Sequence, residues 1–388
     1  MKILADENIP HIKELFSKFA EITTCDGRKI TGDKLTDVDV LLVRSVTKVN
    51  QALLENSSVK FVGTATIGLD HIDTKYLHSK GIAFTNAKGC NSISVAEYVL
   101  SGLLVYADKF QLDLRNSRVG IIGAGNVGKA VAERLEVMGV AYCMHDPVLK
   151  KGNKRRTDLV EESELANCDI ITVHVPLTKP SESKWPTENM IDSDFFSRMK
   201  SLRCFINTAR GNILVSESLK DWLDSSDEHQ CIIDVWRDEP NIDGETLNKC
   251  FLGTPHIAGH TREGKTRGTL MLYHAFCKLF EIEDTLEDDL FLKRDLPKDH
   301  INVKHELSFI QCLSSAIWQV YDIRHDDKAL RAGLNKDITR HFDRLRKGYK
   351  VRREFSAHCL CPHSTPDGSR RTLLELGFRD PDDQESLS

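Results

Sequence analysis

Hydrophobic residues in the first hundred positions occur in short continuous runs, separated by longer stretches of mixed character. The runs at 3–5, 40–43, 61–64 and 81–85 have the length and apolar composition of strands that are buried on both faces. Charged amphipathic stretches lie between them, and the pattern over 94–107 is typical of a helix. This alternation predicts a parallel sheet covered by helices.

A second series of the same kind starts near Arg118. Helices are predicted at 126–138 and 216–223, between apolar runs at 119–123, 141–146, 170–175, 204–207 and 231–236. Repeated strand–helix units of this kind predict a second doubly wound sheet. The pattern changes after about residue 285, where charged segments are followed by a predicted helix at 307–321 and a basic stretch at 342–355.

The composition indicates a folded chain of more than one domain. A length of 388 residues exceeds what one core usually organises, and a net charge of −5 gives no reason to expect nucleic acid or an anionic membrane as partner. The most apolar stretch, 95–107, contains Glu97 and is too short to span a bilayer. The N-terminus has no secretory apolar region, and eleven scattered cysteines favour reduced thiols in the cytoplasm, without a bound metal.

A glycine-rich motif follows the first strand of the second series. Gly123, Gly125 and Gly128 fit the pattern G-x-G-x-x-G, and Asn126 and Val127 open the next predicted helix. These glycines permit a tight turn, the close approach of a pyrophosphate and the packing of the helix on the strand. The N-terminus of the helix then presents unpaired N–H groups to the phosphates, so the motif predicts a dinucleotide site.

Asp146 ends the next predicted strand about twenty residues later, where an acidic side chain accepts hydrogen bonds from both ribose hydroxyls. Its charge would repel a 2′-phosphate, which favours NAD over NADP. Lys150, Lys151 and the basic residues at 154–156 argue the other way, because they could pair with that phosphate. Such a run is more often a solvated loop, and we therefore expect NAD.

Three polar residues follow successive predicted strands, at the edge where doubly wound sheets bind ligands. They are Arg210, Glu239 and His256. Oxidation of a secondary alcohol by hydride loss requires a base for the hydroxyl proton, and an imidazole titrates near working pH. A carboxylate would fix the imidazole tautomer, and a guanidinium would hold a substrate carboxylate through two hydrogen bonds.

These motifs together resemble those of the D-isomer-specific 2-hydroxyacid dehydrogenases. They are the glycine motif, the segment 207–211, the segment 234–240 and the segment 254–259. The resemblance implies that Arg210 orients the substrate, that His256 donates or accepts the proton, and that Glu239 is the partner of His256. It also implies that NAD contacts Thr208, Asp234 and Gly259 as well as Val175, a position where the family often has Thr.

Further segments are similar to the branch of this family that oxidises 4-phospho-D-erythronate. They lie at 1–10, 43–50, 61–68, 89–91 and 259–269. The similarity implies Ser45 and Thr66 as substrate contacts, and Arg44 and Lys48 would bring positive charge beside them. His260 stands where this branch usually has Tyr, which implies a substrate contact there too. The residues 67–69 also depart from the pattern of the branch.

The resemblance assigns a role to each part of the chain. Residues 1–94 and 257–284 would form a flavodoxin-like substrate-binding domain, residues 95–256 a Rossmann NAD-binding domain, and residues 285–388 an α+β dimerisation domain. The implied partners are a small phosphorylated 2-hydroxy acid and a second copy of the chain. The basic stretch from Arg344 to Arg353 would be a dimer contact, or an arm near the substrate phosphate, more readily than a nucleic-acid-binding face.

Two other functions stay open at this point. The hydride-transfer motifs would be shared by an enzyme that acts on 3-phosphoglycerate or glyoxylate. The same fold also serves binding proteins that sense NAD without catalysis, although such a protein would have no need of a base and its partner.

Overall fold

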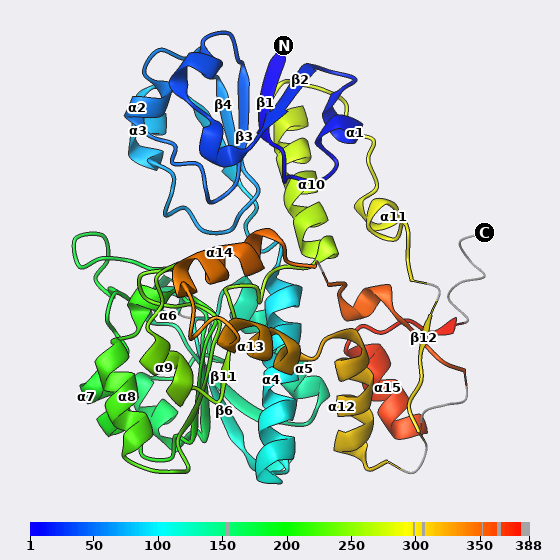
Figure 1. Cartoon of the computed structure of the whole chain (residues 1–388). Helices are drawn as coiled ribbons and strands as arrows, with labels where there is room; N and C mark the ends of the chain where they lie inside the picture. The colour runs from blue at the N-terminus through cyan, green and yellow to red at the C-terminus, as the bar shows by residue number, and fades with distance from the viewer. Residues whose placement is uncertain (153–155, 298, 305–306, 351, 363–365, 382–388) are drawn as a thin grey trace. The chain divides into compact units, whose positions relative to one another are not determined.

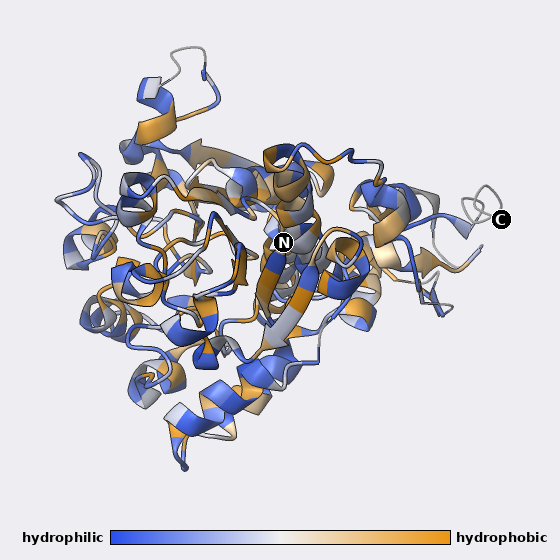
Figure 2. Cartoon of the chain, turned by 90° about the horizontal axis from the view of Figure 1, so that it is seen from above, coloured by the Kyte–Doolittle hydropathy of each residue, from blue (hydrophilic) through white to orange (hydrophobic). Residues whose placement is uncertain are grey.

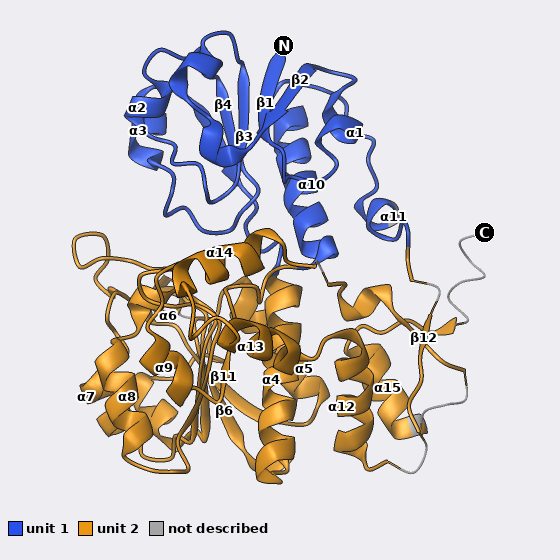
Figure 3. Cartoon of the chain, in the orientation of Figure 1, with its two compact units in different colours: residues 1–91, 261–295 blue, residues 92–260, 296–388 orange. Residues whose placement is uncertain are grey.

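The computed structural model describes residues 1–152, 156–297, 299–304, 307–350, 352–362 and 366–381. These residues form two compact units, residues 1–91 with 261–295 and residues 92–260 with 296–388 (Figure 3). Each unit contains one large parallel sheet (Figure 1). In the described part of the chain, no helix is both long enough and apolar enough to cross a membrane.

The sheet of the first unit confirms the strands predicted in the first hundred residues. Its strands are β1 (Lys2–Asp6), β2 (Glu21–Cys25), β3 (Val40–Val43), β4 (Phe61–Thr64) and β5 (Ala83–Asn86), in the order β2-β1-β3-β4-β5. This order is that of flavodoxin-like doubly wound sheets. The edge strand β2 was not predicted, because its side chains are mostly exposed and form no apolar run.

Helices cover both faces of this sheet. They are α1 (Ile12–Phe16), α2 (Gln51–Leu54), α3 (Thr74–Ser79), α10 (Arg262–Leu279) and α11 (Asp288–Leu292), with 3₁₀ turns at Gly27–Lys29 and Gly32–Leu35. Alternate strand residues face opposite ways. Ile3 and Leu42 pack with Phe276 of α10, whereas Leu4 and Leu41 pack with the side of the unit that carries α2 and α3.

The second unit has a six-stranded parallel sheet. Its strands are β6 (Arg118–Ile122), β7 (Ala141–His145), β8 (Ile170–Val173), β9 (Cys204–Asn207), β10 (Gln230–Ile233) and β11 (Leu252–Gly253), in the order β11-β10-β9-β8-β6-β7. Leu159 pairs with Met144 of β7 through a single parallel bridge, in the place of a further edge strand. With that bridge counted as the third strand, the order is that of a Rossmann fold.

The helices of this unit again lie on both faces of the sheet (Figure 1). They are α4 (Ser92–Phe110), α5 (Asn126–Val137), α6 (Pro147–Gly152), α7 (Ser193–Arg198), α8 (Ser216–Asp224) and α9 (Gly244–Lys249), with 3₁₀ turns at Leu114–Asn116, Glu162–Asn167 and Gly211–Ile213. The core on one face includes α4 and α5, and the core on the other includes α7, α8 and α9. The sheets are largely hydrophobic, whereas the helices mix hydrophobic and hydrophilic positions (Figure 2).

The C-terminal segment, residues 296–381, packs within the second unit. It contains β12 (His300–Ile301), α12 (Phe309–Val320), α13 (Ile323–Arg331), α14 (Ile338–Lys347), a 3₁₀ turn at Phe355–Ala357, β13 (Cys359–Leu360) and α15 (Asp367–Glu375). Ile317 of α12 and Phe355 belong to the same core as α4, and Phe342 of α14 belongs to the core on the opposite face. This segment therefore completes both hydrophobic faces of the second unit.

Candidate active site

The glycine motif between β6 and α5 has the geometry of a pyrophosphate cradle. Gly123 has φ 97°, and a Cβ atom there would lie 2.5 Å from the carbonyl oxygen of His174. A Cβ atom on Gly128 would lie 1.9 Å from the carbonyl oxygen of Gly123, so this glycine brings α5 onto the strand. Gly125 begins α5 without a side-chain cap and faces open space. The first N–H groups of α5 are therefore available to phosphates, and the residues present fit NAD.

Asp146, directly after β7, is tied to the same turn. Its Oδ2 accepts a hydrogen bond from the Ala124 N–H (3.0 Å), and its Oδ1 accepts one from the Leu149 N–H (2.9 Å). The basic residues that argued for NADP are partly neutralised. Lys150 pairs with Glu161 (2.6 Å) and Arg156 with Asp158 (2.7 Å), whereas residues 154 and 155 lie outside the described residues.

Replacing Asp146 with Asn is expected to raise the ratio of kcat/KM with NADP to that with NAD by about 10- to 100-fold, because the repulsion of a 2′-phosphate disappears. Asn keeps one oxygen, which can accept from only one of the two backbone N–H groups of Ala124 and Leu149, so thermal unfolding is measured beside the kinetics. Steady-state kinetics with both cofactors measure the ratio, and Asp221→Asn, at an exposed position of α8, is the matched control. An unchanged ratio in Asp146→Asn would show that this carboxylate does not select the cofactor.

His174 is a polar residue of this site that was not predicted. It follows β8, and its ring contacts the hydroxyl oxygens of Thr172 through Nε2 (2.9 Å) and of Thr208 through Nδ1 (3.0 Å). Burial lowers the pKa of His174 to about 3, so the ring stays neutral. The neutral ring of His174, after β8, thus holds Thr208, after β9. Val175 is the residue that directly follows His174. The only signal in the sequence was a histidine at the end of an apolar run.

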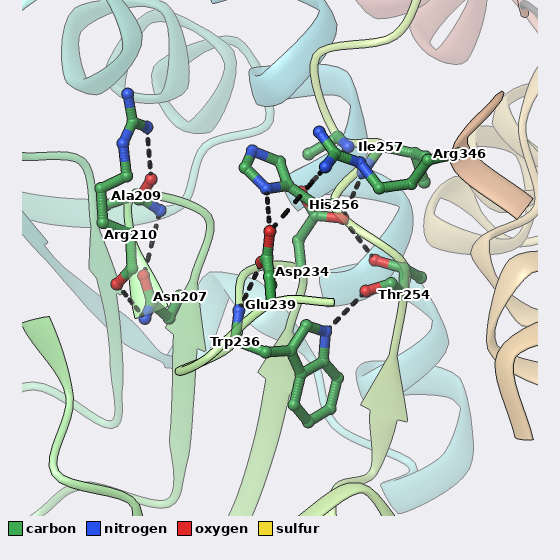
Figure 4. A network of polar contacts seen from close by, with 11 residues as sticks. Asn207, Ala209, Arg210, Asp234, Trp236, Glu239, Thr254, His256, Ile257 and Arg346 are labelled. Carbon is green, nitrogen blue, oxygen red and sulfur yellow. Dashed lines mark hydrogen bonds and ion pairs between the residues drawn. The ribbon is translucent and has the colours of Figure 1, made fainter. Parts of the chain in front are cut away.

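His256 and Glu239 form a close pair (Figure 4). His256 Nδ1 lies 2.7 Å from Glu239 Oε2. Since a carboxylate can only accept, Nδ1 carries the proton, and Nε2 of the neutral ring is left with a lone pair. The His256 side chain is one-third exposed, which leaves this base open to a substrate. His256 has φ 57°, a left-handed conformation that is uncommon for residues other than glycine.

Glu239 is held as a carboxylate. Burial by itself would raise the pKa of the Glu239 carboxyl, but the charge and the hydrogen bond of His256 outweigh it, and the pKa lies below its ordinary value. The Trp236 N–H, which donates to Glu239 Oε1 (2.7 Å), and the charge of Arg346 act in the same direction. Glu239 is therefore ionised where it faces the imidazole.

Asp234 fixes the loop that carries His256 and Gly259. The Asp234 side chain is buried, and its carboxylate accepts hydrogen bonds from Thr254 Oγ1 (2.6 Å), the Ile257 N–H (2.8 Å) and the Ala258 N–H (3.0 Å). Burial raises its pKa, and the charge of His256 and these donors oppose that rise. Asp234 thus sets the backbone of the loop from inside the protein.

Arg210 follows β9, beside the end of β10. Asn207 Nδ2 donates to the carbonyl oxygen of Arg210 (3.1 Å), and Arg210 Nη1 donates to that of Ala209 (2.7 Å). A Cβ atom on Gly211 would lie 1.9 Å from the carbonyl oxygen of Trp236, so the loops after β9 and β10 touch there. Arg210 and the segment that bears Glu239 are therefore on adjoining loops (Figure 4).

The predicted substrate contacts of the first unit follow two neighbouring strands. Ser45 is exposed in the turn after β3, and Thr66 follows β4, with its Oγ1 2.8 Å from the Thr64 hydroxyl oxygen. Lys265, in the first turns of α10, adds a positive charge that was not predicted. Burial and then the charge of Arg44 lower the pKa of Lys265 to about 8. Such a pair of cations favours an anionic ligand.

His260 and the basic stretch belong to the second unit. The ring of His260 packs edge-on against Tyr349, with ring centroids 5.8 Å apart. Arg352 is buried, and its Nη2 donates to the carbonyl oxygens of Ser94 (2.9 Å) and Ala258 (2.6 Å). Arg352 is therefore an internal anchor of the loop, and the expectation of a phosphate-binding arm is wrong for this residue. Among the described residues, no three His, Cys, Asp or Glu side chains are grouped to hold a metal ion.

Comparisons with known proteins identify the family. A family model described as D-isomer specific 2-hydroxyacid dehydrogenase, NAD binding domain, matches residues 96–258, and a domain of unknown function (DUF3410) matches residues 296–377. The chain is 40% identical over 381 residues to erythronate-4-phosphate dehydrogenase of Tolumonas auensis, covering 97% of this chain and 99% of the relative. It is also 40% identical over 382 residues to the protein of that name from Proteus mirabilis, with the same coverage.

Solved structures agree on the fold. NAD⁺-bound 3-phosphoglycerate dehydrogenase of Entamoeba histolytica has a TM-score of 0.61 at 25% identity, and covers 72% of this chain and 95% of its own. NAD-dependent formate dehydrogenase of Staphylococcus aureus has a TM-score of 0.58 at 24% identity, and covers 74% of this chain and 98% of its own. The chain has the fold, the NAD-binding domain and the full length of its curated relatives. It belongs to the erythronate-4-phosphate dehydrogenases, within the D-isomer-specific 2-hydroxyacid dehydrogenase family.

Proposed function

We propose that this chain oxidises 4-phospho-D-erythronate with NAD to 2-oxo-3-hydroxy-4-phosphobutanoate and NADH, a step toward pyridoxal 5′-phosphate. The observation that carries the chemistry is the 2.7 Å contact between His256 Nδ1 and Glu239 Oε2 at the carboxyl edge of the NAD-binding sheet. The substrate is supported by 40% identity over 97% of the chain to relatives that bear the enzyme's name.

His256 is the proposed base. Its Nε2 takes the proton of the C2 hydroxyl, while Nδ1 remains bonded to Glu239, whose negative charge stabilises the imidazolium that forms. NAD, when bound, accepts the hydride that leaves C2. The proton thus ends on His256, and the C2–H electron pair leaves with the hydride, so the alcohol becomes a ketone.

Arg210 is the proposed clamp for the substrate. A guanidinium holds a carboxylate through two parallel hydrogen bonds, and its charge polarises the oxygen that becomes the ketone. Ser45, Thr66 and His260 are the proposed contacts to the rest of the substrate. Lys265 and Arg44 supply positive charge in the first unit, as a phosphorylated substrate requires.

NAD would be held by the glycine motif, Asn126, Val127, Asp146, Val175, Thr208, Asp234 and Gly259. We further propose a homodimer in the cytoplasm, with residues 285–388 as the dimerisation domain beside a substrate-binding domain (1–94 and 257–284) and an NAD-binding domain (95–256). Support for the dimer is the family resemblance of the C-terminal segment.

The proposal is tested by the absorbance of NADH. Its formation from NAD is followed with 4-phospho-D-erythronate, 3-phosphoglycerate and unphosphorylated erythronate, and its consumption is followed with glyoxylate. A 2-oxo acid is added in a parallel run, in case the cofactor is held tightly. We expect a clear preference for 4-phospho-D-erythronate and a rate of oxidation that rises with pH, because the reaction requires a base that is free to accept the hydroxyl proton. Preference for another acid would overturn the substrate. No turnover of any acid, with NAD still bound, would favour an NAD-sensing binding protein.

A further inference from the structure

Helix α14 of the C-terminal segment lies against the loop that contains Glu239. Phe342 is fully buried in the core that also contains Trp236, and Thr339 Oγ1 donates to Asn241 Oδ1 (3.2 Å). His341 Nε2 contacts the carbonyl oxygen of Ala329 (2.8 Å), which fixes the helix to α13. The position of α14 relative to this loop is therefore set by packing and by hydrogen bonds on both sides.

Arg346 extends from α14 to the catalytic pair. Its Nη1 lies 4.0 Å from Glu239 Oε2, the same oxygen that accepts from His256 (Figure 4). The guanidinium carbon lies 5.9 Å from the centre of the Phe342 ring, one helical turn earlier. Arg346 Nε is buried without a hydrogen-bond partner in the structure. The residue thus carries a partly buried charge that is aimed at Glu239 rather than at solvent.

We propose that Arg346 is a positioning residue of the active site, which sets the balance of charge on the Glu239–His256 pair. A separation of 4.0 Å is an ion pair but not a hydrogen bond, so Glu239 Oε2 stays available to the imidazole. The positive charge offsets part of the carboxylate's charge, and the imidazolium is then stabilised less than it would be by Glu239 alone.

Charges of both signs surround the Glu239–His256 pair. Asp234 lies below the loop of His256 and has the opposite sign to Arg346. The charges that lower the pKa of the Glu239 carboxyl include those of two cations, His256 and Arg346. Removal of Arg346 would leave two carboxylates, Asp234 and Glu239, to favour the imidazolium. The direction of the effect is therefore defined.

Arg346 belongs to the segment that matches the family model of a domain of unknown function, residues 296–377. The role proposed for Arg346 rests on that of His256 as the base, but not on the identity of the substrate. The segment would thus influence the chemistry through Glu239, in addition to any role in assembly.

The test compares Arg346→Met with the parent enzyme. Met retains the length and much of the packing on Phe342 but removes the charge. We expect the acid limb of the pH profile of kcat/KM for oxidation to move up by about half to one pH unit, a modest shift because the guanidinium is partly exposed. Arg346→Lys, which keeps the charge, should restore the profile. Arg340→Met, an exposed arginine of the same helix, is the matched control and should not move it.

A second measurement does not depend on turnover. Nitrogen NMR of the histidine rings, with the His256 signal assigned from His256→Asn, should show the titration midpoint of this ring displaced upward in Arg346→Met. The displacement without turnover of 4-phospho-D-erythronate would support Arg346 and reject the substrate. An unchanged midpoint in a folded Arg346→Met, or an equal shift in Arg340→Met, would overturn the proposal. So would a loss of activity that is uniform with pH.

Discussion

Replacing His256 with Asn is expected to lower kcat for oxidation by about 10³- to 10⁴-fold, because the hydroxyl proton loses its acceptor. Asn is the appropriate substitution, since His256 has φ 57° and Asn tolerates this left-handed conformation better than Ala does. NAD affinity should remain close to that of the parent enzyme, which fluorescence titration of NADH can verify. Single-turnover kinetics then isolate the chemical step.

Glu239→Gln should reduce kcat by a smaller factor, about 10²-fold, because Gln has no charge to stabilise the imidazolium and only one oxygen for two donors, His256 Nδ1–H and the Trp236 N–H. Glu228→Gln, at an exposed loop position, is the matched control and should be neutral. A kcat for His256→Asn within tenfold of the parent value would remove His256 from the role of base. Equal losses in Glu239→Gln and Glu228→Gln would remove Glu239 from the role of its partner.

Gly211→Ala is expected to have the second largest effect. Its Cβ atom would lie 1.9 Å from the carbonyl oxygen of Trp236 and 2.0 Å from the carbonyl carbon, so the loops after β9 and β10 must separate. Arg210 is the neighbour of Gly211, and Trp236 donates its N–H to Glu239. We expect kcat/KM to fall at least about 10²-fold, as misplacements near 1 Å do, and stability to fall by about 1–3 kcal/mol.

The two losses can be separated by experiment. Thermal unfolding gives the change in stability, and kinetics well below the unfolding temperature give the loss that comes from geometry. Gly368→Ala is the matched control, because a Cβ atom there meets nothing within 4 Å. Full activity in Gly211→Ala would mean that the two loops need not touch for catalysis.

The sequence predicted those elements whose pattern is local. The strands from β6 to β10 are apolar runs bounded by polar residues, and the glycine motif lies at the tight turn between β6 and α5. The edge strand β2 could not be found, since exposed side chains leave no periodic signal. The third strand of the Rossmann order is reduced to one bridge at Leu159, and a single pairing has no pattern of its own.

The candidate site divides in the same way. Arg210, Glu239 and His256 each follow a strand, so their meeting edge could be anticipated from the sheet, although their roles stay predictions. The contact of Arg346 with Glu239 could not be anticipated, because Arg346 lies on a helix more than a hundred residues away in sequence. His174 was hidden for another reason, as its partners are two hydroxyls that any strand end can supply.

The return of α10 to the first unit, and of the C-terminal segment to the second, has a consequence for the order of folding during synthesis. Leu270, Leu272 and Phe276 of α10 cover a face of a sheet whose last strand ends at Asn86. The first unit must therefore leave the ribosome with that face bare, until the whole NAD-binding sheet has been made. The two hydrophobic cores of the second unit are likewise incomplete until Phe342 and Phe355 have been synthesised. Neither unit can close its core early, and a chaperone that shields apolar surface should raise the yield of folded protein.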